Sequence, residues 1–208
     1  MAKSKESGFS SGSTPQKATQ SGHDDGLQVG SVVYRSDDEV EQIAQYLGVD
    51  EDRAYADYKA VTEFTGHHYS DIRESARNGG TDERWKQCED FIANAPQWNG
   101  GETRRGIELS SKDFSKIKVG DTFDVNGGGP ASWSTSAGVA DSFAGNRAGH
   151  SVVFIAKKHG SATSVKGISR HEDEDEVLSS MNNKYKVTSV SKGNGPRNNR
   201  LYVEVEVV

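Results

Sequence analysis

Residues 174–178 read Glu-Asp-Glu-Val-Leu and end an acidic run that begins at Glu172. On composition alone, such a run is most often a solvated loop. Glu174 and Glu176, however, are two positions apart, so both would point to the same face where the loop enters the strand Val177-Leu178. We therefore expect two carboxylates to face one cleft, where their mutual repulsion raises at least one pKa and suits that group to accept a proton.

The chain on either side of this run has the pattern of a β-sheet. After Pro96, Gly-rich turns separate short apolar segments such as Val152 to Ala156. The segment 201–207 alternates strictly, and its apolar residues Leu201, Val203, Val205 and Val207 share one face. These patterns predict β-strands in the second half of the chain.

The first half has helical periodicity instead. Apolar residues recur at helix spacing in four segments: Ser36 to Gly48, a segment from near Asp50, Tyr69 to Gly79-Gly80, and a segment around Cys88. Helices followed by strands predict an α+β domain rather than alternating parallel units. Residues 1–26 are rich in Ser, Gly, Lys and Gln, so we expect a disordered tail there and one domain over residues 27–208.

Composition limits the classes of function. The 208 residues carry a net charge of -6, which argues against broad affinity for nucleic acid, so we expect no direct nucleic-acid binding. Cys88 is the only cysteine and excludes an intramolecular disulfide. No apolar run approaches the ~18 residues that a membrane span needs, and no signal segment is evident. We expect a soluble monomer that is made in the cytoplasm.

Metal chemistry finds no support in the sequence. His67 and His68 would point to different faces of a helix, and no Cys, Asp or His partner lies at ligand spacing. We expect no metal site. Phosphate-binding loops, dinucleotide fingerprints, nucleophile elbows and paired-histidine zinc motifs are absent too.

Three further motifs precede the acidic run: Arg105-Gly106, Ser134-Thr135-Ser136 and Phe143-Ala144-Gly145. Each has an ordinary structural explanation when it is taken alone. A surface arginine is usually solvated, hydroxyl residues commonly satisfy turns, and a single aromatic residue is as often part of a core. Their significance lies in their order along the chain.

In this order, Arg105-Gly106, Ser134-Thr135-Ser136 and Glu174-Asp175-Glu176 resemble the signature of the mono-ADP-ribosyltransferases. The resemblance runs from about Val29 to the C-terminus. It implies an α+β fold in which two small β-sheets form a split β-sandwich around a NAD cleft, with an N-terminal helical portion. The helix from Glu63 to Arg77 is similar to the one that closes a wall of that cleft.

The resemblance also implies roles for individual residues. Glu176 would bond the ribose hydroxyl and stabilise the developing cation, while Glu174 would position and deprotonate an acceptor arginine. Ser134 would hydrogen-bond the catalytic glutamate and fix its rotamer. Arg105 would grip the NAD pyrophosphate, with Arg104 as a competing candidate because the family usually has an aromatic residue before Arg-Gly.

Further contacts with NAD are implied for Gly106, whose backbone would approach the nicotinamide amide, and for Phe143, which would stack on nicotinamide from a loop. The remaining residues implied to hold NAD are Arg77, Ser134, Thr135, Ser136 and Arg147. His171 would recognise the target protein, although an exposed loop histidine fits its position equally well.

The activity implied is transfer of ADP-ribose from NAD, the co-substrate, to an arginine of a target protein. Relatives that modify asparagine carry glutamine at the position of Glu174, so glutamate favours an arginine acceptor. Two alternatives stay open: NAD glycohydrolysis with water as acceptor, and a degenerate scaffold used for binding. The latter is motivated by Arg104 and by Arg73, which stands where the family often has asparagine. Similar domains serve bacterial toxins and effectors and phage enzymes, so a phage-borne source or a specialised delivery route fits as well.

Overall fold

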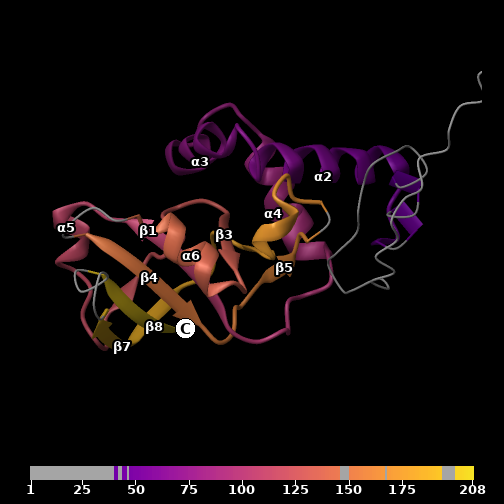
Figure 1. Ribbon diagram of the computed structural model, residues 1–208. Coiled ribbons are helices and arrows are strands. Elements are labelled where there is room, and N and C mark those ends of the chain that lie inside the picture. The colour runs from indigo at the N-terminus through magenta and orange to yellow at the C-terminus, as the bar shows by residue number, and fades with distance from the viewer. Residues whose placement is uncertain (1–39, 42–43, 46, 146–149, 167, 194–199) are drawn as a thin grey trace, which may run out of the picture.

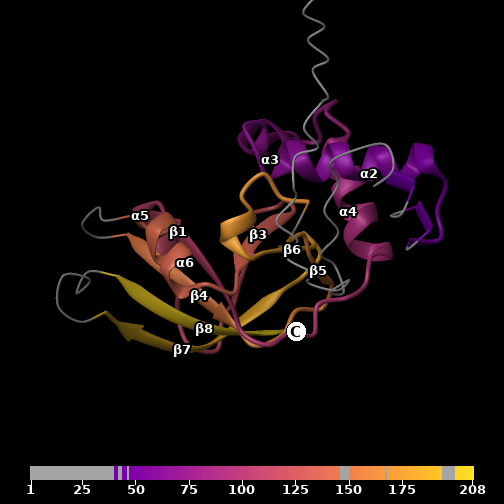
Figure 2. The same ribbon diagram turned by 45° about the vertical axis from the view of Figure 1, so that its right-hand side comes forward.

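The computed structural model describes residues 40–208 except 42–43, 46, 146–149, 167 and 194–199. The expected tail over residues 1–26 lies outside the described part. Within that part, the helices are α2 (Glu51–Phe64), α3 (Tyr69–Asn78), α4 (Arg84–Asn94), α5 (Ser111–Phe114) and α6 (Ala137–Phe143), with a 3-10 turn, η1 (Glu172–Glu174). Helices α2, α3 and α4 gather at one end of the molecule, and α5 and α6 lie beside the strands (Figures 1 and 2).

The helix boundaries follow local sequence signals. The Asp50 side chain caps α2 by accepting the amide proton of Arg53 at 2.7 Å, and Gly79 ends α3 in the left-handed conformation at φ 64°. Of the first expected helix, the described residues Val40, Glu41, Ala44, Gln45 and Leu47 are helical. The helical first half is therefore confirmed for the described residues.

The periodicity predicted two separate helices, and the structure confirms them as α2 and α3, whereas the single helix from Glu63 to Arg77 that the resemblance implied is wrong because a turn divides it. Thr65 ends α2, and its hydroxyl accepts the amide proton of Arg170 at 3.0 Å. A Cβ at Gly66 would lie 3.2 Å from the side chain of Arg170. The break thus lets the segment around Arg170 pack directly against the helical portion.

The strands form one eight-stranded sheet in the order β2-β7-β8-β4-β1-β3-β6-β5. The pairs are antiparallel except for β4 and β8, and β8 lies between β7 and β4. The strand bounds are β1 (Thr103–Glu108), β2 (Thr122–Phe123), β3 (Ala131–Ser134), β4 (Ser151–Ala156), β5 (Ala162–Ser164), β6 (Glu176–Ser179), β7 (Tyr185–Lys192) and β8 (Leu201–Val207).

The two small sheets that we expected appear as two halves of this one sheet. β1 pairs with β4 along its whole length, but it pairs with β3 only through Arg104 and Ser134. The α+β architecture with its helical portion is confirmed, and the junction between β1 and β3 is the weak line between the halves. The alternation expected in β8 is also found, since Val203 and Val205 are buried while Glu204 and Glu206 are exposed.

Helix α6 covers the face of the sheet formed by β1 and β4 (Figure 1). A buried ion pair fixes it to β8: Arg200 Nη1 donates to Asp141 at 2.8 Å, and Arg200 Nη2 donates to the Gly145 carbonyl at 2.5 Å. The Tyr202 hydroxyl donates to the same carboxylate at 3.1 Å. Because Arg200 is only 4% exposed, removing one partner would leave a buried charge uncompensated.

His159 is half-buried and follows β4, where its ring contacts three residues of other strands. Its Nε2 contacts the Thr103 hydroxyl at 2.6 Å, its Nδ1 contacts the Tyr185 hydroxyl at 2.7 Å, and its ring meets the Trp133 ring edge-on with centroids 4.8 Å apart. Burial lowers the pKa of His159 to about 4. The neutral imidazole is therefore the form that the folded protein holds.

We expect His159 to make folding stability depend on pH. Between pH 6.5 and pH 4 the unfolded chain binds a proton that the folded protein does not, so stability falls as pH decreases by roughly 3 kcal/mol. Urea unfolding at several pH values measures this slope, which His159→Gln should reduce. His67→Gln, at an exposed histidine, is the control. An equal slope in His159→Gln and the parent would contradict the prediction.

Candidate active site

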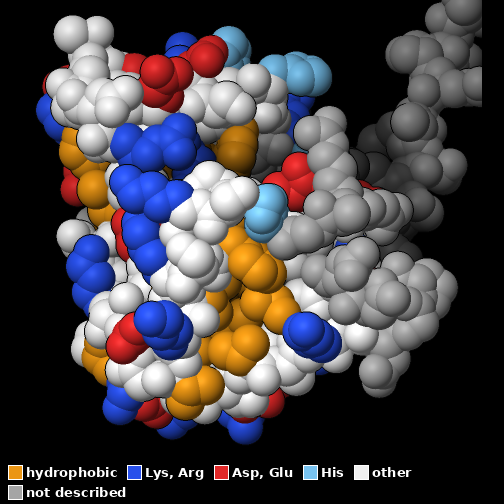
Figure 3. All heavy atoms as spheres, turned by 90° about the vertical axis from the view of Figure 1, so that its left-hand side faces the viewer, with side chains coloured by type: hydrophobic (Ala, Val, Ile, Leu, Met, Phe, Trp, Pro, Cys, Tyr) orange, Lys and Arg blue, Asp and Glu red, His pale blue; other side chains and the backbone are white. Residues whose placement is uncertain are grey.

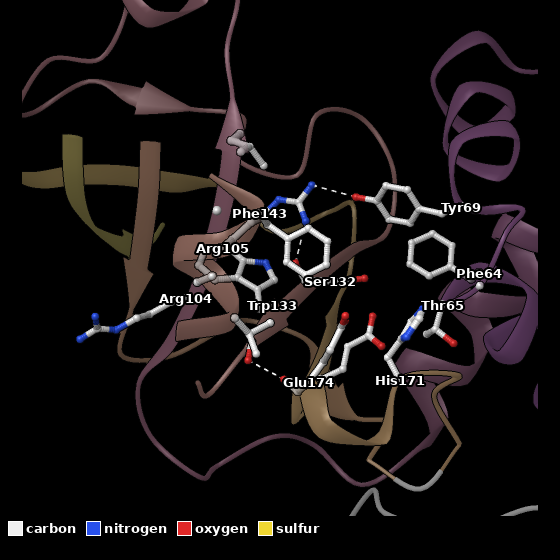
Figure 4. A pocket seen from close by; sticks show the side chains of 17 residues that line it. Phe64, Thr65, Tyr69, Arg104, Arg105, Ser132, Trp133, Phe143, His171 and Glu174 are labelled. Atoms are coloured by element: carbon white, nitrogen blue, oxygen red, sulfur yellow. Dashed lines mark hydrogen bonds between the residues drawn. The ribbon is translucent and has the colours of Figure 1, made fainter. Parts of the chain in front are cut away.

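A cleft of about 230 Å³ lies at the junction of the two halves of the sheet. Its walls come from β1, β3 and β6 on one side, from the turn between α2 and α3 on another, and from α6 and the η1 turn (Figure 4). The lining residues used below are Phe64, Tyr69, Arg105, Gly106, Ser132, Ser134, Phe143, His171, Glu174 and Glu176. Residues from both halves of the chain therefore meet at one site.

Glu176 begins β6 and is only 4% exposed. The Ser169 hydroxyl donates to its Oε2 at 2.5 Å. Burial raises the pKa of Glu176, hydrogen bonds from Ser132 and Ser169 oppose this rise, and the nearby charge of Glu174 adds to it. The expected direction is found, but burial rather than repulsion between carboxylates is its main cause.

Ser134 faces Glu176 across the β3–β6 pair. Its hydroxyl does not donate to the Glu176 carboxylate, as the resemblance implied, but to the backbone carbonyl of Glu174 at 2.5 Å. It also accepts the amide proton of Ser136 at 2.9 Å. Ser134 thus fixes the main chain beside Glu174, while Ser169, which the sequence reasoning missed, contacts the carboxylate of Glu176.

Glu174 reaches the same cleft by a different route from the one expected. It ends the η1 turn, and Asp175 then adopts the left-handed conformation at φ 44°, the only positive φ among the described residues other than glycine. This conformation, rather than strand alternation, aims both glutamates into the cleft. Asp175 itself points outward and pairs with Lys166 at 2.9 Å. Partial burial raises the pKa of Glu174, and the charge of His171 partly offsets this rise.

We expect the residue type at position 175 to control the stability of this turn. The left-handed conformation costs ordinary residues about 1–2 kcal/mol and suits Gly, Asn and Asp best. Asp175→Val should therefore lower the free energy of unfolding by about 1–2 kcal/mol relative to Asp175→Asn, as measured by urea unfolding. Because both variants lose the ion pair with Lys166, their difference isolates the backbone. Equal stability of the two would contradict the prediction.

Arg105, not Arg104, points into the cleft. Arg105 is 6% exposed, and its Nη1 donates to the Ser132 carbonyl at 2.6 Å while its Nη2 donates to the Tyr69 hydroxyl at 3.2 Å. Arg104 forms an ion pair with Glu102 at 2.8 Å, and its guanidinium points away from the centre of the cleft (Figure 4). The structure thus separates the two competing arginines by position.

Gly106 lies directly beneath α6. A Cβ at this position would lie 2.6 Å from the amide nitrogen of Ala144 and closer still to the carbonyl oxygen of Ala140. Because both neighbours are backbone atoms of one helix, they cannot move aside separately. The packing of α6 on β1 therefore explains this glycine without a ligand.

Phe143 stands at the mouth of the cleft and is 58% exposed. It is the last residue of α6, so neither a core position nor the expected loop describes it. Tyr69 and Phe64 lie on the opposite wall, with ring centroids 5.2 Å apart (Figure 4). The cleft thus offers aromatic surface on two sides.

Some residues expected to contact NAD do not line the cleft. Thr135 is exposed, and Ser136 caps α6 by accepting the amide proton of Val139 at 3.4 Å. Arg77 is exposed and lies beside Gly128. Arg147 falls outside the described residues. His171 does line the cleft and lies near Glu174.

Charges and apolar groups share one face of the molecule. Figure 3 shows hydrophobic side chains gathered beside a column of Lys and Arg side chains, although the net charge is -6. A ligand with anionic and aromatic parts would meet both kinds of group on such a surface. The described residues contain no group of three or more His, Cys, Asp or Glu side chains placed to hold a metal ion, and none of their helices is both long and apolar enough to cross a membrane.

The fold is similar to those of bacterial ADP-ribosyltransferases. The Vis toxin of Vibrio splendidus is 20% identical with a TM-score of 0.58, over 84% of this chain and 87% of that chain. The toxin Plx2a of Paenibacillus larvae is 17% identical (TM-score 0.57, 85% and 99%), and the C3 exoenzyme of Clostridium limosum is 14% identical (TM-score 0.55, 86% and 97%). No protein-family model and no curated protein matches the sequence. The chain therefore has the ADP-ribosyltransferase fold.

Proposed function

We propose that the protein is a mono-ADP-ribosyltransferase that moves ADP-ribose from NAD to arginine side chains of a target protein and releases nicotinamide. One observation carries this proposal: Glu174 and Glu176 line the same cleft as the buried Arg105. The fold similarity to ADP-ribosyltransferases supports it.

The cleft offers a matching group for the diphosphate, the nicotinamide and the ribose between them. Arg105 suits the diphosphate, since a guanidinium binds phosphate oxygens in a bidentate manner. Phe143, exposed at the mouth, suits the nicotinamide ring. Glu176 would then lie beside the ribose that joins them.

The proposed reaction exchanges one bond at the ribose C1 for another. The bond to nicotinamide breaks, nicotinamide leaves with the electron pair, and the sugar gains oxocarbenium character as in glycoside hydrolysis. A guanidinium nitrogen of the acceptor forms the new bond and gives up a proton. Glu176 would stabilise the cation, and Glu174 would accept the proton.

The environments of the two glutamates suit these different roles. Burial raises the pKa of Glu176, and the hydrogen bonds from Ser132 and Ser169 oppose this rise, so these two serines favour the charged form that would stabilise a cation. Glu174 is only half-buried, with a raised pKa, so it remains open to an acceptor and suited to take a proton.

The arginine acceptor is supported by Glu174 at the first position of the motif. Vis has been solved with agmatine, which carries the guanidinium of arginine, and Exoenzyme S of Pseudomonas aeruginosa has been solved with Carba-NAD. These neighbours are toxins and effectors. We therefore include in the proposal that the protein is a monomer and that it modifies a protein of a host cell. It would reach that cell by a specialised delivery route or be encoded by a phage.

NAD glycohydrolysis is the second candidate. The half-buried position of Glu174 supports it, because a water molecule can reach the place of the acceptor. The proton would again pass to Glu174, but the products would be ADP-ribose and nicotinamide.

Transfer of labelled ADP-ribose from NAD to agmatine and to a cell lysate tests the proposal. The parent should label both, whereas Glu174→Gln should lose transfer but still consume NAD. The control is Glu206→Gln, at an exposed position on β8. NAD loss that agmatine does not alter, without labelling, would favour hydrolysis, and no NAD loss at all would overturn both candidates.

A further inference from the structure

Two buried arginines share one tyrosine oxygen at the wall of the cleft. Arg73 is 8% exposed and Arg105 is 6% exposed. Arg73 Nη1 donates to the Tyr69 hydroxyl at 2.5 Å, and Arg105 Nη2 donates to the same oxygen at 3.2 Å. Arg73 Nη2 also donates to the Asn126 carbonyl, and Arg105 Nη1 donates to the Ser132 carbonyl. Their acceptors are therefore neutral oxygens.

The two positive charges have little compensation. Among the described residues, no carboxylate forms an ion pair with Arg73 or Arg105. The Nε atom of each arginine is also buried, with no hydrogen-bond partner among those residues. Burial, followed by the charge of Arg105, lowers the pKa of Arg73 to about 10. Such a pair favours a negative charge nearby.

Tyr69 is placed to supply that charge. Burial acts to raise the pKa of Tyr69, but the charges of Arg105 and Arg73 and their hydrogen bonds together outweigh it and lower the pKa to about 8. The neutral hydroxyl accepts two hydrogen bonds, whereas the phenolate would form an ion pair with both guanidinium groups.

We propose that Arg73 is a positioning residue that makes the Tyr69 hydroxyl an ionisable ligand of Arg105, so that Arg105 binds an anionic substrate only while Tyr69 is protonated. The inference rests on the proposed function, because the anion in question is the diphosphate of NAD. Arg73 stands behind Tyr69 and does not line the cleft, so it acts through the tyrosine.

The sign of the pH dependence follows from competition between two anions. Below pH 8 Tyr69 is neutral, and Arg105 offers its full charge to the diphosphate. Above pH 8 the phenolate offsets one of the two guanidinium charges and competes for Arg105, so affinity falls by up to about tenfold for each pH unit. Without Arg73 the pKa of Tyr69 would move back toward 10, so the fall in affinity would begin at a higher pH.

Other groups near Tyr69 must be separated from this effect. Arg73 from α3 and Arg105 from β1 face the hydroxyl, while Phe64 from α2 meets the ring with an apolar edge. Glu174, Glu176 and His171 line the same cleft. These three residues are still present in Tyr69→Phe, so subtracting the pH dependence of that variant removes their contribution to the pH dependence of the parent.

The first test needs no ligand. Phenolate absorbance is followed in a pH titration of the parent, Tyr69→Phe and Arg73→Gln, with circular dichroism at each pH to verify folding. The parent minus Tyr69→Phe should show one tyrosine that titrates near pH 8. In Arg73→Gln its midpoint should rise by about one pH unit or more, whereas Arg73→Lys should restore part of the shift. An unchanged midpoint in folded Arg73→Gln would overturn the proposal.

The second test measures binding of NAD and of inorganic pyrophosphate by calorimetry at pH 7 and pH 9. The affinity of the parent should fall roughly tenfold between these values, and Tyr69→Phe should show no such fall. Glu74→Gln, exposed on the same helix, should behave like the parent. The same fall in Tyr69→Phe, or no binding of either anion, would overturn the proposal. Pyrophosphate binding with this pattern but no NAD binding would support it while the proposed function fails.

Discussion

Glu176→Gln should reduce the rate of NAD consumption by about a thousandfold, whatever the acceptor. Removing one charged group that stabilises a transition state typically costs a factor of this order. Glutamine keeps the shape of the side chain and can still accept a hydrogen bond from Ser169, so the loss reports on the charge. The measurement is nicotinamide release under single-turnover conditions, with and without agmatine.

This variant should remain folded. Because burial raises the pKa of Glu176, the carboxylate costs stability as pH rises through that raised pKa. A neutral glutamine removes this cost, so the free energy of unfolding at pH 7 should not decrease. Glu206→Gln, on the exposed face of β8, should leave both properties unchanged. A folded Glu176→Gln that consumes NAD at the parent rate would refute the role of Glu176.

Gly106→Ala should destabilise the protein by roughly 3 kcal/mol or more, at the upper end of what overpacking costs. The added methyl group would overlap backbone atoms of Ala140 and Ala144, so α6 must shift as a whole. The shift would separate these two residues from Val153 and move Phe143 at the mouth of the cleft. NAD binding should weaken together with stability.

Gly138, which lies in α6 itself, supplies the control. The nearest heavy atom to a Cβ at Gly138 would lie 3.9 Å away, so Gly138→Ala has room. It should stabilise the protein by about 0.5–1 kcal/mol, because alanine is the better helix former. Thermal and urea unfolding measure both variants. A Gly106→Ala protein as stable as the parent would contradict the packing argument.

Local sequence patterns were sufficient to predict those helices and strands whose boundaries and periodicity are set by their own residues. Strict alternation predicted β8, and Asp50 and Gly79 marked ends of α2 and α3 that the structure confirms. The same patterns separated α2 from α3, but they could not show what packs against the turn between these helices. That packing includes a contact between Thr65 and Arg170, which are 105 positions apart.

In the candidate site, too, the sequence predicted some residues correctly and could not show the contacts that others make. The order of motifs was enough to place Arg105, Ser134, Glu174 and Glu176 around one cleft. It could not show that Ser169, rather than Ser134, contacts the Glu176 carboxylate, because a serine in a loop carries no distinguishing signal. Arg73 was visible as a departure from the family pattern, but its contact with Tyr69 gains meaning only through Arg105 from a distant strand.

The position of β8 has a consequence for the timing of biosynthesis. A ribosome finishes β1, β3, β4 and β6, and with them both glutamates, before it makes residues 200–207. Until then β4 lacks its parallel neighbour, and the pair of β2 and β7 has no link to the other strands. Arg200 is not yet present to hold α6. Pairing across such sequence distances is slow and comes late. The sheet and the support of α6 should therefore be complete only after translation of β8, so the proposed activity would begin after that point.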